Sequence, residues 1–275
     1  MLVTSMAKSK LIALGCSYPE HYLHSMHAMG VDHSFTRWPQ LLADKLDMEC
    51  VNLGRSGMGN EFMVSKLLDV LHTEKNIGLV VIMWSEWQRM DFQIKPDRWH
   101  PLHPHRKNER VEKFPMNEEG RKTLLEYYNP VAATMKNLRQ FFVAQELIKD
   151  IPYLMIQGDD PLCDAMYLFP DDINNRWYTD ANGSHMHRWH IIEKIKKKAI
   201  KQIIKSPISD RINEDNFIGW PIFHHIGGAC VDDMLDNFDP ERKIYRVSPN
   251  DTHPNGPGHE VISEEIYKAY KKVYG

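Results

Sequence analysis

Short apolar runs alternate with amphipathic segments along this chain. Five of the runs are short and nearly continuous, and they predict strands at residues 11–15, 49–53, 78–84, 152–157 and 243–247. Apolar residues also recur at helical spacing, which predicts helices at residues 35–46, 61–71, 131–148, 189–204 and 257–270. Buried strands that alternate with helices are typical of a parallel sheet covered on both faces. The pattern therefore predicts an α/β fold with a five-stranded parallel sheet.

The length of 275 residues fits a single domain spanning residues 1–275, and two long segments interrupt the alternation. Residues 91–129 are rich in proline, histidine and charge, and residues 207–242 are rich in aspartate, asparagine and aromatic side chains. Both are longer than ordinary connections between elements. We interpret them as insertions that could form lids or substrate walls, although disorder or partner contacts would give similar compositions.

Composition and charge exclude several classes of protein. The net charge is −3, from 34 basic and 37 acidic residues, so nothing in the overall balance favours nucleic-acid binding. No run of eighteen apolar residues occurs, so no membrane span is expected. The first ten residues lack the apolar run of a secretory signal, and the four cysteines form no CxxC pair. A reducing, cytoplasmic location is therefore expected, without a disulfide framework.

Sites in parallel α/β sheets form at the carboxyl ends of the strands, so the segments that follow the predicted strands are the candidates for chemistry. The first strand runs into Gly15, Cys16, Ser17 and Tyr18. A serine in this position can expose its hydroxyl while surrounding backbone N–H groups stabilise an oxyanion. By itself the signal is weak, because small residues also cap ordinary strand–helix turns.

The second strand is followed by a glycine-rich segment at residues 54–59 and then by Asn60. Three glycines in six residues permit unusual backbone angles and close approach of a ligand to the main chain. An ordinary glycine turn, with Asn60 capping the following helix, explains the segment equally well.

A third polar segment precedes the last predicted helix and contains Asp251 and His253. An acid near a histidine can fix the tautomer of the imidazole and stabilise its charged form, as a general base acting on a serine requires. A turn rich in Asn, Asp and Pro would have the same composition.

Taken together, the three segments resemble the SGNH (GDSL-type) hydrolase family, in a variant whose first motif reads Gly-Cys-Ser. The resemblance covers roughly residues 10–93, 152–157 and 243–274 and leaves both insertions aside. It implies a flavodoxin-like, three-layer α/β/α fold. It also implies ester hydrolysis through a serine nucleophile, with no metal or organic cofactor.

The resemblance assigns roles by position. Ser17 matches the nucleophile, and its own N–H and that of Gly57 match oxyanion donors, while His253 matches the base. The family places the acid three residues before the histidine, which here is Asn250. We expect Asp251 to take that role, because an asparagine cannot carry the charge that stabilises an imidazolium.

The chain departs from the family after the third strand. The family has Gly-x-Asn-Asp there, and its asparagine completes the oxyanion hole, whereas this chain reads Trp-Ser-Glu-Trp-Gln-Arg over residues 84–89. Three side chains could substitute for that donor, namely Asn60, Ser85 and Arg89. Glu86, Asn250 and His259 are further residues that could line the site, although capping or packing explains His259 equally well.

Histidines cluster at residues 100–105, 185–190 and 224–225. Zinc sites use histidines at such spacings, but usually with a cysteine or carboxylate in a fixed frame. We therefore expect no metal, and we interpret these histidines as surface or lid residues.

Two functional hypotheses follow. The first is a serine esterase that cleaves a small acyl or acetyl ester of a small molecule or an acylated carbohydrate. The second is a non-catalytic module of the same fold that binds a glycan or an assembly partner, motivated by the missing third-block asparagine and the shifted acid. The sequence leaves homo-oligomers open. The distinguishing observation is whether the Ser17 hydroxyl and the His253 ring lie within hydrogen-bond reach.

Overall fold

The computed structural model describes residues 7–20, 34–102, 119–120, 123, 129–162, 177–179, 185–248 and 251–275. Its centre is a five-stranded sheet in the order β2-β1-β3-β6-β9, in which all neighbouring strands are parallel. The strands are β1 (Lys10–Leu14), β2 (Glu49–Asn52), β3 (Ile77–Trp84), β6 (Tyr153–Gln157) and β9 (Phe217–Ile218). This is the 2-1-3-4-5 order of doubly wound flavodoxin-like sheets, so the predicted fold class is confirmed.

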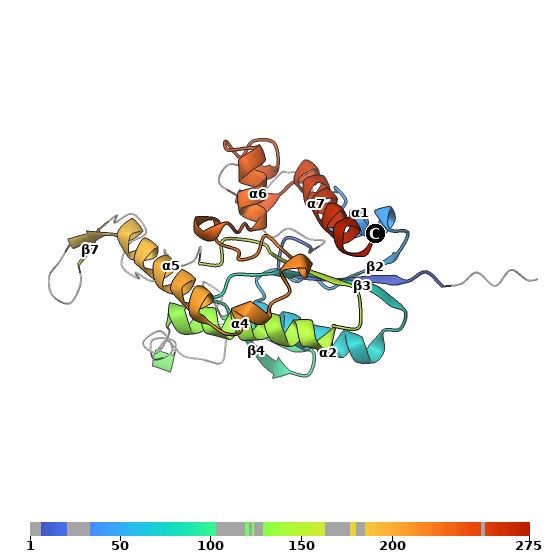
Figure 1. Cartoon of the computed structure of the whole chain (residues 1–275), viewed down its shortest axis with the longest axis horizontal. Coiled ribbons are helices and arrows are strands. Elements are labelled where there is room, and N and C mark those ends of the chain that lie inside the picture. Colours follow the sequence, from blue (N-terminus) through green and yellow to red (C-terminus); the bar gives the residue numbers. More distant parts are fainter. Residues whose placement is uncertain are drawn as a thin grey trace, which may run out of the picture.

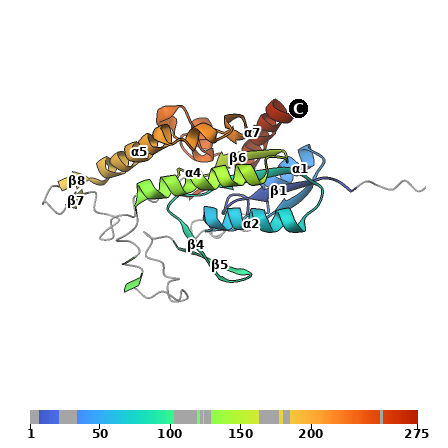
Figure 2. The same ribbon diagram turned by 60° about the horizontal axis from the view of Figure 1, so that its bottom comes forward.

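Helices cover both faces of the sheet (Figure 1). One face carries α1 (Trp38–Lys45), α6 (Val231–Phe238) and α7 (Gly256–Tyr274). The other carries α2 (Asn60–Thr73) and α4 (Pro130–Leu147), with α5 (Arg188–Lys205) packed along α4 (Figure 2). The arrangement is therefore the three-layer α/β/α sandwich that the resemblance implied.

Alternation along the strands divides the core into two apolar clusters, one on each face of the sheet. On β1, Leu11 and Ala13 face the layer of α1 and α7, whereas Ile12 and Leu14 face α2 and α4. All four side chains are fully buried. Successive side chains of a strand point to opposite faces, so a strand buried on both sides reads as a continuous apolar run. This is why the central strands could be recognised from sequence.

The fifth strand lies elsewhere than predicted. The sheet is completed by β9, a two-residue strand inside the segment that we interpreted as the second insertion. The predicted strand at residues 243–247 instead corresponds to β10 (Arg246–Ser248), which pairs antiparallel with β11 (Asp251–Pro254) outside the main sheet. Phe217 of β9 is buried against Phe141 of α4, so the edge strand is held by a contact between distant segments.

The remaining described elements are short or peripheral. The first predicted insertion begins with a hairpin beside α2, formed by β4 (Met90–Lys95) and β5 (Arg98–Leu102) (Figure 2). A second small hairpin pairs β7 (Trp177–Thr179) with β8 (His185–His187). Single 3₁₀ turns occur at η4 (Ser209–Arg211), η5 (Glu214–Asn216) and η6 (His224–Ile226). Among the described helices, none combines the length and apolar character that crossing a bilayer requires.

Candidate functional site

The chain turns sharply where β1 ends, and Ser17 lies in this turn. We call residues 15–20 the serine turn. Its backbone is tied to the segment after β2, since the Arg55 N–H donates to the Gly15 carbonyl at 3.0 Å and the Asn52 amide donates to the Pro19 carbonyl at 2.5 Å. A Cβ on Gly54 would come within 2.7 Å of the Pro19 ring. Glycine is therefore required there for the two segments to approach.

The β10–β11 hairpin brings Asp251 and His253 to the same place. One carboxylate oxygen of Asp251 accepts from the His253 backbone N–H at 3.1 Å and lies 2.6 Å from Nδ1 of the same residue. The other ring nitrogen of His253, Nε2, lies 2.8 Å from the Ser17 hydroxyl oxygen. A carboxylate only accepts hydrogen bonds, so these partners place the ring proton on Nδ1 and leave Nε2 to accept from the serine.

Burial differs along this series in a way that suits proton transfer. The Asp251 side chain is 4% exposed, whereas the His253 side chain is 25% exposed and Ser17 is partly exposed. The acid is thus shielded from water while the hydroxyl and the ring remain reachable. The structure brings together the three residues that the sequence singled out as a triad, and their catalytic roles stay predictions.

The start of α7 fixes the hairpin. Asn255 caps this helix by accepting from the Gly258 N–H at 3.0 Å, and its amide nitrogen donates to the carbonyls of Ile244 and Arg246 at 2.8 and 2.9 Å. An N-cap side chain satisfies backbone groups that the first helical turn leaves open. Here the same residue also locks the strand that precedes His253.

Two backbone donors lie in the segments next to the hydroxyl. Gly57 has a φ of +79°, a left-handed angle that favours glycine, in the turn after β2. Within the part of the chain that the structure describes, the N–H groups of Ser17 and Gly57 have no protein acceptor. Their assignment as oxyanion donors, which the resemblance implies, stays a prediction.

The structure corrects the expectation for Asn60. Its amide nitrogen donates to the Ser85 carbonyl at 3.2 Å and to Asn137 Oδ1 at 2.6 Å, and its Oδ1 accepts from the Ser85 N–H at 2.9 Å. Both amide hydrogens are thus used inside the protein, and the residue is 1% exposed. Asn60 holds the end of β3 in place and has no hydrogen left for an oxyanion.

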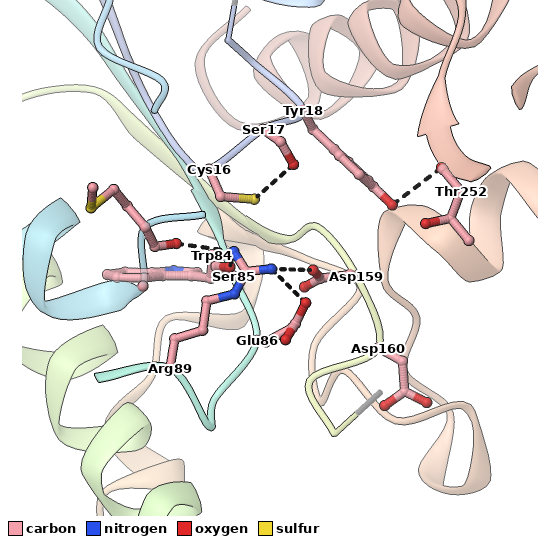
Figure 3. A network of polar contacts seen from close by, with 12 residues as sticks. Cys16, Ser17, Tyr18, Trp84, Ser85, Glu86, Arg89, Asp159, Asp160 and Thr252 are labelled. Atoms are coloured by element: carbon pink, nitrogen blue, oxygen red, sulfur yellow. Dashed lines mark hydrogen bonds and ion pairs between the residues drawn. The ribbon is translucent and has the colours of Figure 1, made fainter. Parts of the chain in front are cut away.

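The other two candidate donors, Ser85 and Arg89, belong to a buried polar network behind Cys16 (Figure 3). Arg89 donates to the Met58 carbonyl at 3.1 Å, to the Ser85 hydroxyl at 2.6 Å and to Glu86 at 2.5 Å. Ser85, Glu86 and Arg89 are at most 6% exposed. They do not line an open site as expected. Instead, Arg89 ties the glycine segment that contains Met58 to the end of β3.

Asp159, which follows the end of β6, is a second acid beside Glu86 in the buried network of Arg89. Its carboxylate lies 3.9 Å from the Arg89 guanidinium. Burial raises the pKa of Asp159 well above its usual value, and the nearby Glu86 carboxylate raises it further. No sequence signal marked Asp159. Its proximity to Arg89 depends on the pairing of β6 with β3, which brings the ends of the two strands together.

His259 is buried in the first turn of α7 and is 1% exposed, so it does not line the site. Its Nδ1 accepts from the Trp38 N–H at 3.3 Å, and its Nε2 lies 3.3 Å from the Arg37 guanidinium. Burial lowers the pKa of His259 to about 3, with further lowering by Arg37 and His253. It is a packing residue that joins α7 to α1. Asn250 lies outside the described residues.

This histidine predicts acid sensitivity of the fold. Between pH 6.5 and about pH 3 the unfolded chain binds a proton at His259 and the folded chain does not. Stability therefore falls as the pH falls, by up to about 1.4 kcal/mol per pH unit from this group. Urea unfolding at pH 7 and pH 5 is expected to show a smaller acid loss in His259→Gln than in the parent. An equal loss in both proteins would contradict this assignment, and His225→Gln serves as the control.

The histidine clusters do not converge on a metal in the described part of the chain. His224 and His225 stack with ring centroids 3.8 Å apart on the surface. Across the described ranges, no group of three or more His, Cys, Asp or Glu side chains is arranged to hold a metal ion. His103 and His105 lie outside those ranges, as do the side chains of His185, His187 and His190.

No family model matches the chain, and no curated protein matches it by sequence. Solved structures of similar shape include a member of the lipolytic G-D-S-L family from Veillonella parvula, at 11% identity and a TM-score of 0.42, covering 97% of this chain and 98% of that one. An α/β hydrolase from the Lake Arreo metagenome has 13% identity and a TM-score of 0.47, with 98% of each chain covered. An acetylxylan esterase from Geobacillus stearothermophilus has 12% identity and a TM-score of 0.42, with 96% and 94% covered. Similarities of this size assign no activity to the chain.

Proposed function

We propose that this protein is a serine esterase that hydrolyses a small acyl ester, such as an acetyl ester of a small molecule or carbohydrate. The observation that carries the proposal is the unbroken series from the Asp251 carboxylate through the His253 ring to the Ser17 hydroxyl, with separations of 2.6 and 2.8 Å. A nucleophile, a base and an orienting acid in hydrogen-bond contact form the arrangement that activates a hydroxyl.

In the proposed reaction, His253 Nε2 takes the hydroxyl proton as Ser17 Oγ bonds to the ester carbonyl carbon. The N–H groups of Ser17 and Gly57 stabilise the resulting oxyanion. The C–O bond to the alcohol then breaks, and His253 returns the proton to the leaving oxygen. Water then attacks the acyl carbon and gives a proton to His253. His253 passes this proton to Ser17 Oγ as the Ser17–acyl bond breaks, which releases the acid and restores the free enzyme. Asp251 holds the ring in one tautomer through its contact with Nδ1.

Arg89 holds the Met58 carbonyl next to Gly57, so a guanidinium braces the backbone that would donate to the oxyanion. A side chain of Arg89 or Trp87 in the oxyanion position would favour the non-catalytic module. Trp87 is buried in the core against Phe141 and Phe223. Arg89 is buried and donates to Met58, Ser85 and Glu86.

The proposal is tested with a fluorophosphonate probe, which phosphonylates an activated serine. The parent protein is expected to be labelled at Ser17, with the modified peptide identified by mass spectrometry, and Ser17→Ala is expected to be unlabelled. Ser56→Ala, in the neighbouring glycine segment, is the matched control and should keep the labelling. A folded parent protein that resists the probe, or a label that persists in Ser17→Ala, overturns the proposal.

A further inference from the structure

Tyr18, the residue after the proposed nucleophile, is buried, and both its ring and its hydroxyl contact other parts of the protein. It is 3% exposed, and its ring packs edge-on against the His253 imidazole with centroids 5.5 Å apart. Its hydroxyl donates to Asp232 Oδ1 at 2.6 Å. The same hydroxyl lies 3.3 Å from the Thr252 carbonyl oxygen (Figure 3). One side chain thus contacts the base, the backbone between acid and base, and a distant helix.

Arg246 completes this arrangement from the neighbouring strand. Its guanidinium donates to Asp232 Oδ1 at 2.8 Å, to the Asp232 carbonyl at 3.1 Å and to Asp236 at 3.0 Å, and also to the Thr252 carbonyl. The Arg246 side chain is 1% exposed. Two aspartates of α6 therefore hold an arginine of β10, and this arginine holds the backbone of β11.

The position of Thr252 explains why these contacts matter. It lies between Asp251 and His253 on β11, and alternate side chains of a strand share one face. Fixing the Thr252 carbonyl therefore fixes the two flanking side chains together. On the other side, Tyr18 is joined to Ser17 by a single peptide unit. The same set of contacts can thus set the separation between the hydroxyl and the imidazole.

We propose that Tyr18, Asp232 and Arg246 form a buried clamp that positions the His253 hairpin against Ser17. The inference rests on the proposed esterase function and deepens it, because it names positioning residues for that reaction. Tyr18 packs against the His253 ring without a hydrogen bond to it, and Asp232 and Arg246 act through Tyr18 and the Thr252 carbonyl. The clamp fixes the distance between His253 Nε2 and the Ser17 hydroxyl. Loss of one of its contacts is expected to increase this distance without unfolding the protein.

The test removes one oxygen atom. Tyr18→Phe is expected to lower kcat for p-nitrophenyl acetate by about 10-fold to 100-fold, because small displacements of reacting groups cost rates of this order, while KM stays nearly constant. Tyr274→Phe is the matched control, since its hydroxyl also bonds buried groups, the backbone of Tyr153 and the amide of Asn216. The two variants should lose similar thermal stability. Equal kcat values in both variants would show that Tyr18 is only structural and would overturn the clamp.

A measurement without substrate separates this inference from the esterase proposal. Hydrogen–deuterium exchange over residues 246–248 and 251–253 is expected to be faster in Tyr18→Phe and in Asp232→Asn than in the parent and in Tyr274→Phe. Unchanged exchange in the hairpin overturns the clamp even if Ser17 is labelled by the probe. Faster exchange in a protein whose Ser17 is never labelled supports the clamp and overturns the esterase.

Discussion

His253→Ala is expected to lower kcat/KM for p-nitrophenyl acetate by about 10⁴-fold to 10⁶-fold, as loss of the base does where a catalytic triad acts as a unit. The ring nitrogen lies 2.8 Å from the Ser17 hydroxyl, and without it the proton of that hydroxyl has no acceptor in the triad. The side chain is 25% exposed, so its removal leaves a shallow surface depression rather than a cavity. Ester turnover and thermal melting, measured on the same preparation, check both halves of this expectation.

The matched control for this substitution is His225→Ala, which removes an exposed imidazole that stacks on His224. It should leave turnover unchanged. If His253→Ala keeps activity within about tenfold of the parent while Ser17→Ala loses it, another group takes the serine proton. Such a result would contradict the role assigned to His253 without affecting that of the serine.

The main sheet could be predicted because its inner strands are buried on both faces. The predicted strand at residues 78–84 corresponds to β3 (Ile77–Trp84), and that at residues 152–157 corresponds to β6 (Tyr153–Gln157). Their side chains are apolar almost throughout, which leaves a continuous run in the sequence. The edge strand β9 has only two residues, and no periodicity can be read from two positions.

The false fifth strand has a different cause. The predicted strand at residues 243–247 contains isoleucine, tyrosine and valine, which favour strands, and part of it does form one. However, its Arg246 turns inward to two aspartates of α6, and the strand pairs with β11 instead of the main sheet. Propensity gave the correct local conformation, but the pairing with β11 and the Arg246 contacts with α6 belong to the tertiary structure and leave no pattern in the sequence.

The candidate site also has features that could be predicted from the sequence and features that could not. The meeting of Ser17, Asp251 and His253 could be predicted only from the resemblance to the SGNH family, since the hairpin that carries Asp251 and His253 lies outside the main sheet. The oxyanion side chains could not, since the fate of Asn60 depends on Asn137, which lies 77 residues further along the chain. The Tyr18–Asp232 contact joins residues 214 positions apart and left no local pattern. Hydrogen bonds between residues so far apart in the sequence form only in the tertiary structure, so they cannot be predicted from local patterns.

Asp251→Asn is the second substitution for which we expect a very large effect, a loss of about 10⁴-fold in kcat with little change in KM. The Asp251 carboxylate lies 2.6 Å from His253 Nδ1 and holds the ring proton there. An asparagine amide can instead donate to Nδ1, which moves the ring proton to Nε2 and removes the acceptor for the Ser17 hydroxyl. Asp215→Asn, which alters a side chain 77% exposed, is the matched control and should leave turnover unchanged.

The number of residues between the acid and His253 allows a second test of this prediction. The family that the sequence resembles places the acid three residues before the histidine, at the position of Asn250. The double variant Asn250→Asp/Asp251→Asn therefore asks whether a carboxylate at position 250 can replace the one at 251. We expect no rescue, because Asp251 Oδ1 bonds both the ring and the backbone N–H of His253, a pairing that depends on its place two residues before the histidine. Recovery of kcat in the double variant would show that the hairpin tolerates either spacing. The requirement would then be for a carboxylate near His253, and not for the local geometry of position 251.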